Sequence, residues 1–142
     1  MSTTSTTTST TTSNSRLSAF AIIEGEVNPT YFVSFSGGYM RFSNTCLDAM
    51  NDTDFVQIYI NKDEKQLAVR PVSAGAKNKF SFLYNWRRLA EEAKRTGTHV
   101  PQKEAKIGRS VREFRRIFGI EGNQKFEGAY YEDEGILIFD LK

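Results

Sequence analysis

The chain has 142 residues, and its first fifteen are almost entirely Ser and Thr, which leaves 127 for a packed domain. One Cys, three Pro and apolar runs far shorter than the roughly 20 residues of a membrane span exclude a disulfide scaffold, a paired-cysteine zinc module and a membrane protein. Net charge is +2, but residues 87–116 hold ten Lys and Arg against four Glu, and the rest of the chain holds nine against thirteen. With no secretory signal at the start, the sequence predicts a cytoplasmic protein.

The N-terminal residues 1–15 form a Ser/Thr-rich stretch without an apolar anchor. Short hydroxyl side chains compete with backbone pairing, so we expect a disordered tail here. Residues 16–142 are expected to form a single domain. Its first elements are two β-rich runs, residues 19–26 and 31–35, which the turn dipeptide Asn28-Pro29 joins as a hairpin.

Turn and capping residues mark the boundaries of the next elements. Gly37-Gly38 predicts a turn, and Asn51-Asp52 closes a short helix, after which apolar residues alternate with period two. The predicted elements are a strand at 39–42, a helix capped by Ser43 or Asn44, and a hairpin of strands at 55–60 and 66–72. A Gly/Lys/Asn-rich linker, residues 73–79, then divides the domain.

Two capped helices and a second hairpin follow the linker. We predict a helix at 86–95 capped by Asn85 and stopped by Gly97, a helix at 111–118 capped by Ser110 and stopped by Gly119, and strands at 125–131 and 136–141. The first helix should bury a face formed by Trp86, Leu89, Ala90 and Ala93. Its charges are spaced four apart (Arg87 and Glu91, Arg88 and Glu92, Glu91 and Arg95), which indicates a self-neutralised surface.

The two halves of the domain follow the same order of elements. Setting Phe55 on Phe126 also brings Leu67 onto Leu137. The sequence therefore predicts a first repeat at about 31–72 and a second at about 103–142. A repeat of roughly 40 residues is too short to bury a core alone, so the copies should close on each other about a pseudo-twofold axis.

The first repeat resembles the AbrB/MraZ-type (SpoVT/AbrB-like) transition-state regulators. Their recurring run is Gly-Arg-Ile-x-Ile-Pro-x-x-Ile-Arg-x-x-Leu, of which this chain keeps the Gly and the apolar positions as Gly38, Met40, Phe42, Cys46 and Met50. Ser43 stands in place of the Pro, and Tyr39 and Leu47 stand in place of the two Arg. In the second repeat, Val111-Arg112 fits the Ile-Arg pair.

The resemblance implies a fold and a function. Subunits of that family are swapped hairpins that assemble into a small DNA-binding barrel. For this chain the sequence leaves open whether one copy completes the barrel or two copies do so as a homodimer. The implied fold class is α+β, mostly β, with two related β-α-β-hairpin halves in one chain forming a small AbrB-like barrel. The implied partner is double-stranded DNA.

The best candidate for DNA contact is the stretch from Lys103 to Arg116, with six cations against two carboxylates. Arg side chains suit phosphate oxygens, and a helix N-terminus adds its own positive end. The predicted DNA-binding residues are Arg41, Lys106, Arg109, Arg112, Arg115 and Arg116. The same cations also fit a solvated helix face that pairs with Glu113 and the acidic turns of the other half.

Catalysis has little support in the sequence. His99 and Cys46 are the only residues of their types, and Cys46 falls on the apolar side of its helix, as a small core residue would. The acidic clusters at 63–64 and 132–134 lie in predicted turns without the spacing of a calcium loop. We therefore predict no enzyme activity, no metal site and no cofactor, and keep an enzyme acting through carboxylates alone only as a third hypothesis.

Two functional hypotheses remain from different classes. The first is a non-enzymatic DNA-binding transcriptional regulator. The alternative is a small protein-interaction module without DNA binding, such as a virus- or mobile-element-encoded inhibitor or assembly factor, and the missing family Arg at Tyr39 and Leu47 favour it. A single-strand platform is not predicted, because the aromatics Phe80, Phe82, Tyr84 and Trp86 are expected to pack inward.

Overall fold

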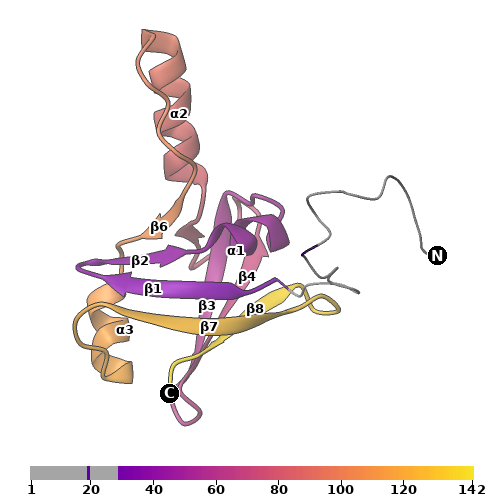
Figure 1. The fold of residues 1–142 in the computed structure, drawn as a ribbon, viewed down its shortest axis with the longest axis vertical. Coiled ribbons are helices and arrows are strands. Elements are labelled where there is room, and N and C mark those ends of the chain that lie inside the picture. The colour runs from indigo at the N-terminus through magenta and orange to yellow at the C-terminus, as the bar shows by residue number, and fades with distance from the viewer. Residues whose placement is uncertain (1–18, 20–28) are drawn as a thin grey trace, which may run out of the picture.

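The computed structural model describes residue 19 and residues 29–142 (Figure 1). The predicted tail at residues 1–15, and the predicted strand at 19–26 apart from Ala19, lie outside the described residues. The strands are β1 (Tyr31–Ser36), β2 (Tyr39–Phe42), β3 (Phe55–Asn61), β4 (Gln66–Val72), β5 (Phe80–Ser81), β6 (Ala105–Ile107), β7 (Gln124–Tyr131) and β8 (Ile136–Asp140). The helices are α1 (Asn44–Ala49), α2 (Tyr84–Thr96) and α3 (Val111–Phe118).

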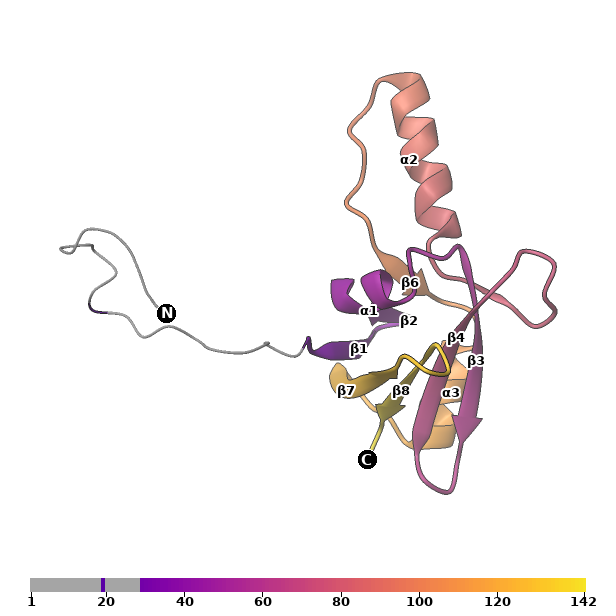
Figure 2. The same cartoon turned by 90° about the vertical axis from the view of Figure 1, so that its right-hand side faces the viewer.

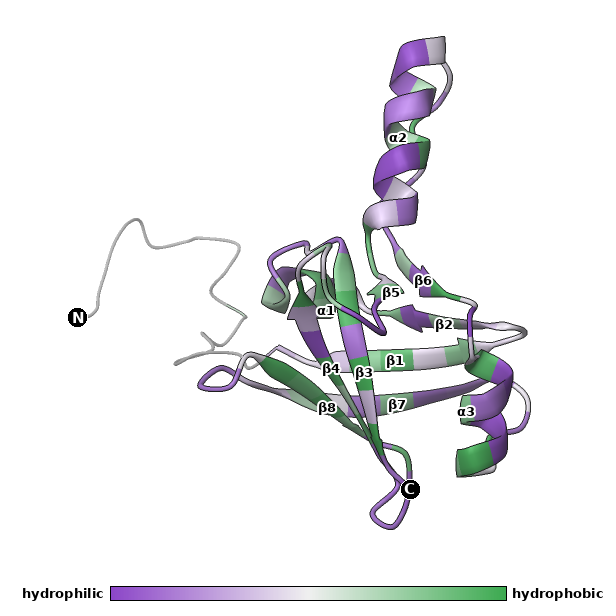
Figure 3. Ribbon diagram, turned by 180° about the vertical axis from the view of Figure 1, so that it is seen from behind, coloured by the Kyte–Doolittle hydropathy of each residue, from purple (hydrophilic) through white to green (hydrophobic). Residues whose placement is uncertain are grey.

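The strands form one antiparallel sheet that curls into a nearly closed barrel. Their order is β5-β3-β4-β8-β7-β1-β2-β6. The two edge strands β5 and β6 contact each other, so the barrel closes along a short seam between them (Figure 3). Helix α3 lies at the end of the barrel where β1 turns into β2 (Figure 1). The predicted mostly-β domain is confirmed, whereas its division into two related halves stays a prediction.

Local sequence signals account for most of the strands. Along β1, Val33 and Phe35 point into the barrel while Ser34 between them points outward. Gly37 takes φ +59° in the turn that follows. The predicted hairpins become β3–β4 and β7–β8. In β7, a Cβ at Gly128 would stand 2.5 Å from a ring carbon of Phe139, so only glycine fits there.

The core fills the barrel with apolar side chains and, in the part of the chain that the structure describes, contains no buried polar or charged residue. Phe42 lies near its centre, with ring centroids of Phe82 and Phe139 at 5.2 and 5.9 Å. Helix α1 adds Cys46 and Leu47, which are fully buried, so the prediction of a core cysteine is confirmed.

Helix α2 differs from its prediction in three ways. It begins at Tyr84 with Leu83 as its N-cap. Asn85 therefore lies inside the helix instead of capping it, and its backbone N–H donates to Ser81 Oγ at 3.1 Å. Leu89 is 61% exposed, so it lies outside the buried face that Ala90 and Ala93 form. None of the expected pairs four residues apart lies within ion-pair distance in this described helix. The tertiary fold offers partners that helical spacing does not reveal.

The predicted aromatic packing is confirmed in part. Phe82 is buried, and Phe80 and Trp86 are partly buried against the core. Tyr84 instead stays 40% exposed, with its ring stacked on that of Phe55. Strand β6 was not predicted at all. It is a three-residue strand that pairs with β2, with Ala105 and Ile107 buried and Lys106 pointing outward.

Candidate nucleic-acid interface

Helix α3 carries three of the predicted DNA-binding residues and is held by an apolar stripe. Its buried residues are Val111, Phe114 and Phe118, as the period of the sequence predicts. Ser110 precedes it with φ +68°, and its side chain makes no capping hydrogen bond. The first amides of α3 therefore receive no side-chain cap from Ser110, which leaves the positive end of the helix open to an anion.

Two of the α3 arginines already have partners within the protein. Arg116 forms a bidentate pair with Glu113 one turn earlier, and its guanidinium lowers the pKa of that carboxyl. Arg115 donates to the carbonyl oxygens of Gly122 at 2.9 Å and Ile120 at 3.4 Å, beyond the end of the helix. Arg112, in the first turn, makes no hydrogen bond or ion pair with any described residue. The three side chains are thus unequal candidates for phosphate contact.

Arg109 lies just before α3 and ties it to the linker 73–79. Its Nη2 donates to the carbonyl oxygen of Lys79 at 2.6 Å, and its guanidinium lies 4.3 Å from the ring centroid of Phe80. Figure 2 shows this linker extending away from the barrel beside β3. The contact brings cations from two separate parts of the chain together.

A hollow forms where the linker meets the start of α3. It has a volume of about 860 Å³, and we call it the basic hollow; its lining residues are Ala76, Lys77, Asn78, Lys79, Phe80, Arg109 and Ser110. Three of these are cations and none is a carboxylate. None of the three lies within ion-pair distance of a carboxylate among residues 19 and 29–142. The basic hollow is therefore a concave site of uniform positive charge.

Lys77 and Lys79 in the basic hollow were not among the predicted binding residues, because residues 73–79 were predicted only as a Gly/Lys/Asn-rich linker. Two lysines within three positions, directly before an aromatic residue, are a signal that could have found them. Their partner Arg109 lies thirty residues further along the chain, and no local pattern predicts that contact.

Arg41 and Lys106 are brought together on the outside of the barrel. They are register partners on β2 and β6. Tyr39 lies beside them, with Lys106 Nζ 4.5 Å and Arg41 Cζ 5.6 Å from its ring centroid. Arg41 also lies 3.5 Å from a carboxylate oxygen of Glu104, and both side chains of that pair are about half exposed. No single hollow unites all six predicted residues among those described.

Helix α2 and the returning segment 97–104 form an arm that stands away from the barrel (Figures 1 and 2). Trp86 Nε1 donates to the carbonyl oxygen of Pro101 at 2.9 Å, which joins the two sides of the arm. A groove of about 950 Å³ runs between the arm and the barrel, and its lining includes Tyr39, Trp86 and Leu89. The arm groove is the second candidate surface.

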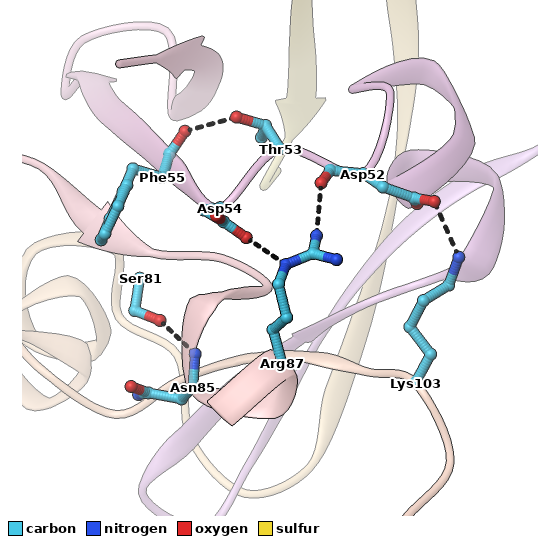
Figure 4. A network of polar contacts seen from close by, with 8 residues as sticks. All are labelled: Asp52, Thr53, Asp54, Phe55, Ser81, Asn85, Arg87 and Lys103. Carbon is cyan, nitrogen blue, oxygen red and sulfur yellow. Dashed lines mark hydrogen bonds and ion pairs between the residues drawn. The ribbon is translucent and has the colours of Figure 1, made fainter. Parts of the chain in front are cut away.

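Polar contacts hold the base of the arm to the loop between α1 and β3 (Figure 4). Arg87 Nε donates to Asp54 Oδ1 at 2.8 Å, and its Nη2 donates to the carbonyl oxygen of Asp52 at 3.1 Å. Lys103 Nζ donates to Asp52 Oδ2 at 3.0 Å. The other carboxylate oxygen of Asp52 is buried without a hydrogen-bond partner in the described residues.

Two further candidates for chemistry are the Cys46 thiol and a metal site built from His, Cys, Asp or Glu. Burial raises the pKa of the Cys46 thiol, which favours its protonated form. No three His, Cys, Asp or Glu residues gather closely enough to hold a metal ion within residues 19 and 29–142. No described helix is both long and apolar enough to cross a membrane. Compared with family models, curated proteins and solved structures, the chain matches none.

Proposed function

We propose that this protein is a non-enzymatic, cytoplasmic DNA-binding regulator that holds the phosphate backbone at the basic hollow. The observation that carries the proposal is the convergence of Lys77, Lys79 and Arg109 on one hollow whose lining has no carboxylate. Like charges gathered without counter-charges repel one another, so an anion that enters between them gains favourable interactions with all three.

The helix start next to the hollow supports the same ligand. Ser110 belongs both to the lining and to the N-cap of α3, so amides of the first turn supplement the side-chain cations. Arg112 extends the positive surface along α3. Arg116 contributes less than the sequence suggests, because Glu113 already neutralises its charge, whereas Arg115, like Arg109, donates only to carbonyl oxygens.

The proposed fold relationship is the AbrB-like one, with two related halves. The pairing of hairpin β3–β4 with hairpin β7–β8 supports it, because the two hairpins meet through their second strands, β4 and β8. Ala68 faces Ile138 in that pairing, and Leu67 faces Phe139. A pseudo-twofold axis through this junction would exchange the hairpins.

The proposal is tested by fluorescence anisotropy of labelled duplex DNA across a salt series. Three phosphate contacts predict a slope of log affinity against log salt of about −3. The variant Lys77→Gln/Lys79→Gln should reduce that slope by about 2 and weaken binding at low salt. The matched control Lys94→Gln/Arg95→Gln removes the same charge from the far end of α2 and should leave binding nearly unchanged. Equal losses in both variants would show that net charge, and not the basic hollow, determines binding.

A protein-interaction module is the second candidate, and the arm favours it. Leu89 is 61% exposed beside the arm groove, an unusual position for a large aliphatic side chain on a helix that stands away from the core. A stoichiometric partner that survives nuclease treatment, and that Leu89→Gln no longer retains, would support this function. Loss of the partner on nuclease treatment alone would instead support DNA binding.

A further inference from the structure

The outer face of β1, β2, β6 and β7 gathers aromatic and cationic side chains. We call it the Tyr39 face, and its outward-pointing residues are Phe32, Ser34, Tyr39, Arg41, Lys106 and Lys125. The four strands lie in front in Figure 1. Strand register places Lys106, Arg41, Ser34 and Lys125 in one row across them. Three strand spacings make that row about 14 Å long.

Tyr39 is the most accessible ring of this face. It keeps 44% of its surface exposed although two cations lie within 6 Å of its centroid. Gly108 lies against it, and a Cβ at that position would stand 3.0 Å from Tyr39 Cε1. The glycine thus leaves room for the ring to lie along the backbone of the link between β6 and α3. A fixed aromatic ring with adjacent cations is the arrangement that nucleobases stack on.

A second aromatic ring lies at the other end of the face. Lys125 Nζ is 4.3 Å from the ring centroid of Phe32. The Cα atoms of Phe32 and Tyr39 lie about 14 Å apart, because four residues along β1 and one strand spacing separate them. That distance corresponds to roughly four stacked nucleotides at 3.4 Å each. The cations of the row lie between the two rings.

Charge alone would make this face a weak nucleic-acid site. Glu104 pairs with Arg41, and Glu127 is the register partner of Phe32, so the three cations of the face meet two carboxylates. Affinity here must come mainly from stacking, and a duplex hides the flat faces of its bases. The nucleic acid that suits the face therefore has unpaired bases.

The Tyr39 face is linked to the basic hollow through the chain between β6 and α3. Lys106 belongs to the face and Arg109 to the hollow, and three residues of chain separate their Cα atoms by at most about 10 Å. We propose that the Tyr39 face binds single-stranded nucleic acid, with a base stacked on Tyr39 and its neighbouring phosphates held by Arg41 and Lys106. This inference rests on the proposed function for the phosphates that reach the hollow, and it specifies the form of nucleic acid bound.

The first test compares three probes of equal length on the intact protein, of which the duplex carries twice the phosphate charge of either single strand. They are a short labelled oligothymidine, the same length of labelled duplex, and an abasic strand that keeps the phosphates without bases. The expected order of affinity places oligothymidine first, with the abasic strand weaker by about 5- to 100-fold, the range for loss of a stacked base. Equal affinity for oligothymidine and the abasic strand would overturn the inference without any mutation.

The second test uses variants of the ring. Tyr39→Ser should weaken oligothymidine binding by about 5- to 100-fold, while Tyr39→Phe stays near wild type because it keeps the π-face. The matched control is Tyr131→Ser, since Tyr131 is also 44% exposed but lies at the far end of β7, six residues beyond Lys125. Circular dichroism and thermal melting establish that each variant is folded. Oligothymidine binding that Tyr39→Ser leaves unchanged would overturn the inference.

The outcomes separate this inference from the proposed function. Duplex binding that Lys77→Gln/Lys79→Gln weakens, together with no effect of Tyr39→Ser on any probe, would preserve the hollow and remove the stacking face. Loss of oligothymidine binding in Tyr39→Ser alone, with no role for the two lysines, would preserve the stacking face and remove the hollow. No binding of any probe at low salt would overturn both.

Discussion

Helices α2 and α3 have similar sequences in outline, yet the protein uses them differently. Both are amphipathic, rich in Arg and terminated by a glycine in the left-handed region. The buried stripe of α3 is Val111, Phe114 and Phe118, and it packs into the barrel core. The buried residues of α2 are only Ala90 and Ala93. Figure 3 shows α3 against the barrel end and α2 standing away from it.

The size of the stripe residues explains this difference. Large side chains can fill the open end of a barrel and remove much apolar surface from water. Two alanines cannot, but they permit the close approach of an extended segment, and here the returning chain 97–104 runs beside α2, with the Thr98 N–H donating to the carbonyl oxygen of Ala93 at 2.9 Å. The lesson is that the period of a helical pattern predicts a buried face, whereas the volume of its residues indicates what can cover that face.

The largest expected effect tests the core role of α3. Phe114→Ala should lower the free energy of unfolding by about 3 kcal/mol or more, because it leaves a cavity beneath the helix. Urea denaturation should show a lower midpoint with an unchanged slope. The matched change in α2, Ala90→Gly, should cost only about 1 kcal/mol, mainly through helix propensity. Similar losses of unfolding free energy in the two variants would contradict the conclusion that α3, but not α2, packs into the core.

A smaller effect is expected at the base of the arm. Arg87→Met removes the contacts to Asp54 and Asp52, but its side chain is 42% exposed, so the global cost should be about 1 kcal/mol or less. The local effect should be clearer, with faster hydrogen exchange in α2 and no change in β3 or β4. Arg88→Met is the control, because Arg88 is not part of these contacts. Unchanged exchange in α2 would show that other contacts hold the arm.

The exposed pair of Glu113 and Arg116 on α3 should shift the pKa of the Glu113 carboxyl with little effect on the stability of the fold. Arg116 lowers the pKa of Glu113, so the favourable contribution is present above the ordinary Glu range and is lost only as pH falls through the lowered value. In Arg116→Gln, the pKa of Glu113 should rise toward its ordinary range. Carbon-detected NMR of the Glu113 carboxyl measures this shift. A pKa that does not move would mean that the pair does not persist in solution.

The smallest expected effect is at the exposed leucine of α2. Leu89→Gln should leave the free energy of unfolding within about 0.5 kcal/mol, because the side chain contributes almost nothing to the core. Leu83→Gln is the opposite case, since Leu83 is fully buried directly before the same helix. Its loss of stability should be several-fold larger. A large cost at Leu89 would mean that the arm folds back onto the barrel in solution.

The parts of the fold that the sequence predicted depend on local signals. Hairpin β3–β4 follows from alternation and a polar turn, and α3 follows from its stripe and Gly119. Strand β6 could not be predicted, because three residues carry too little periodicity and its identity as a strand depends on pairing with β2. The same holds for the start of α2, which Ser81 and the β5 strand fix from outside the helix.

The candidate site was predicted less well than the fold. Helical spacing placed Arg115 near the edge of an exposed face, but it could not reveal that carbonyl oxygens beyond Gly119 accept from its guanidinium. Lys79 was overlooked because its neighbour Arg109 is distant in sequence. Tyr39 was noted only as a departure from a family motif, although its exposure beside Lys106 makes it the centre of a surface.

The arm is inserted between the two edge strands that close the barrel. The chain runs from β5 through α2 and back into β6, so a tilt of the arm would displace both sides of the seam at once. Phe80 in β5 borders the basic hollow, and Lys106 in β6 borders Tyr39. A partner that holds the arm and a nucleic acid that binds across the seam would therefore be thermodynamically linked. By reciprocity, each would change the affinity of the other by the same factor.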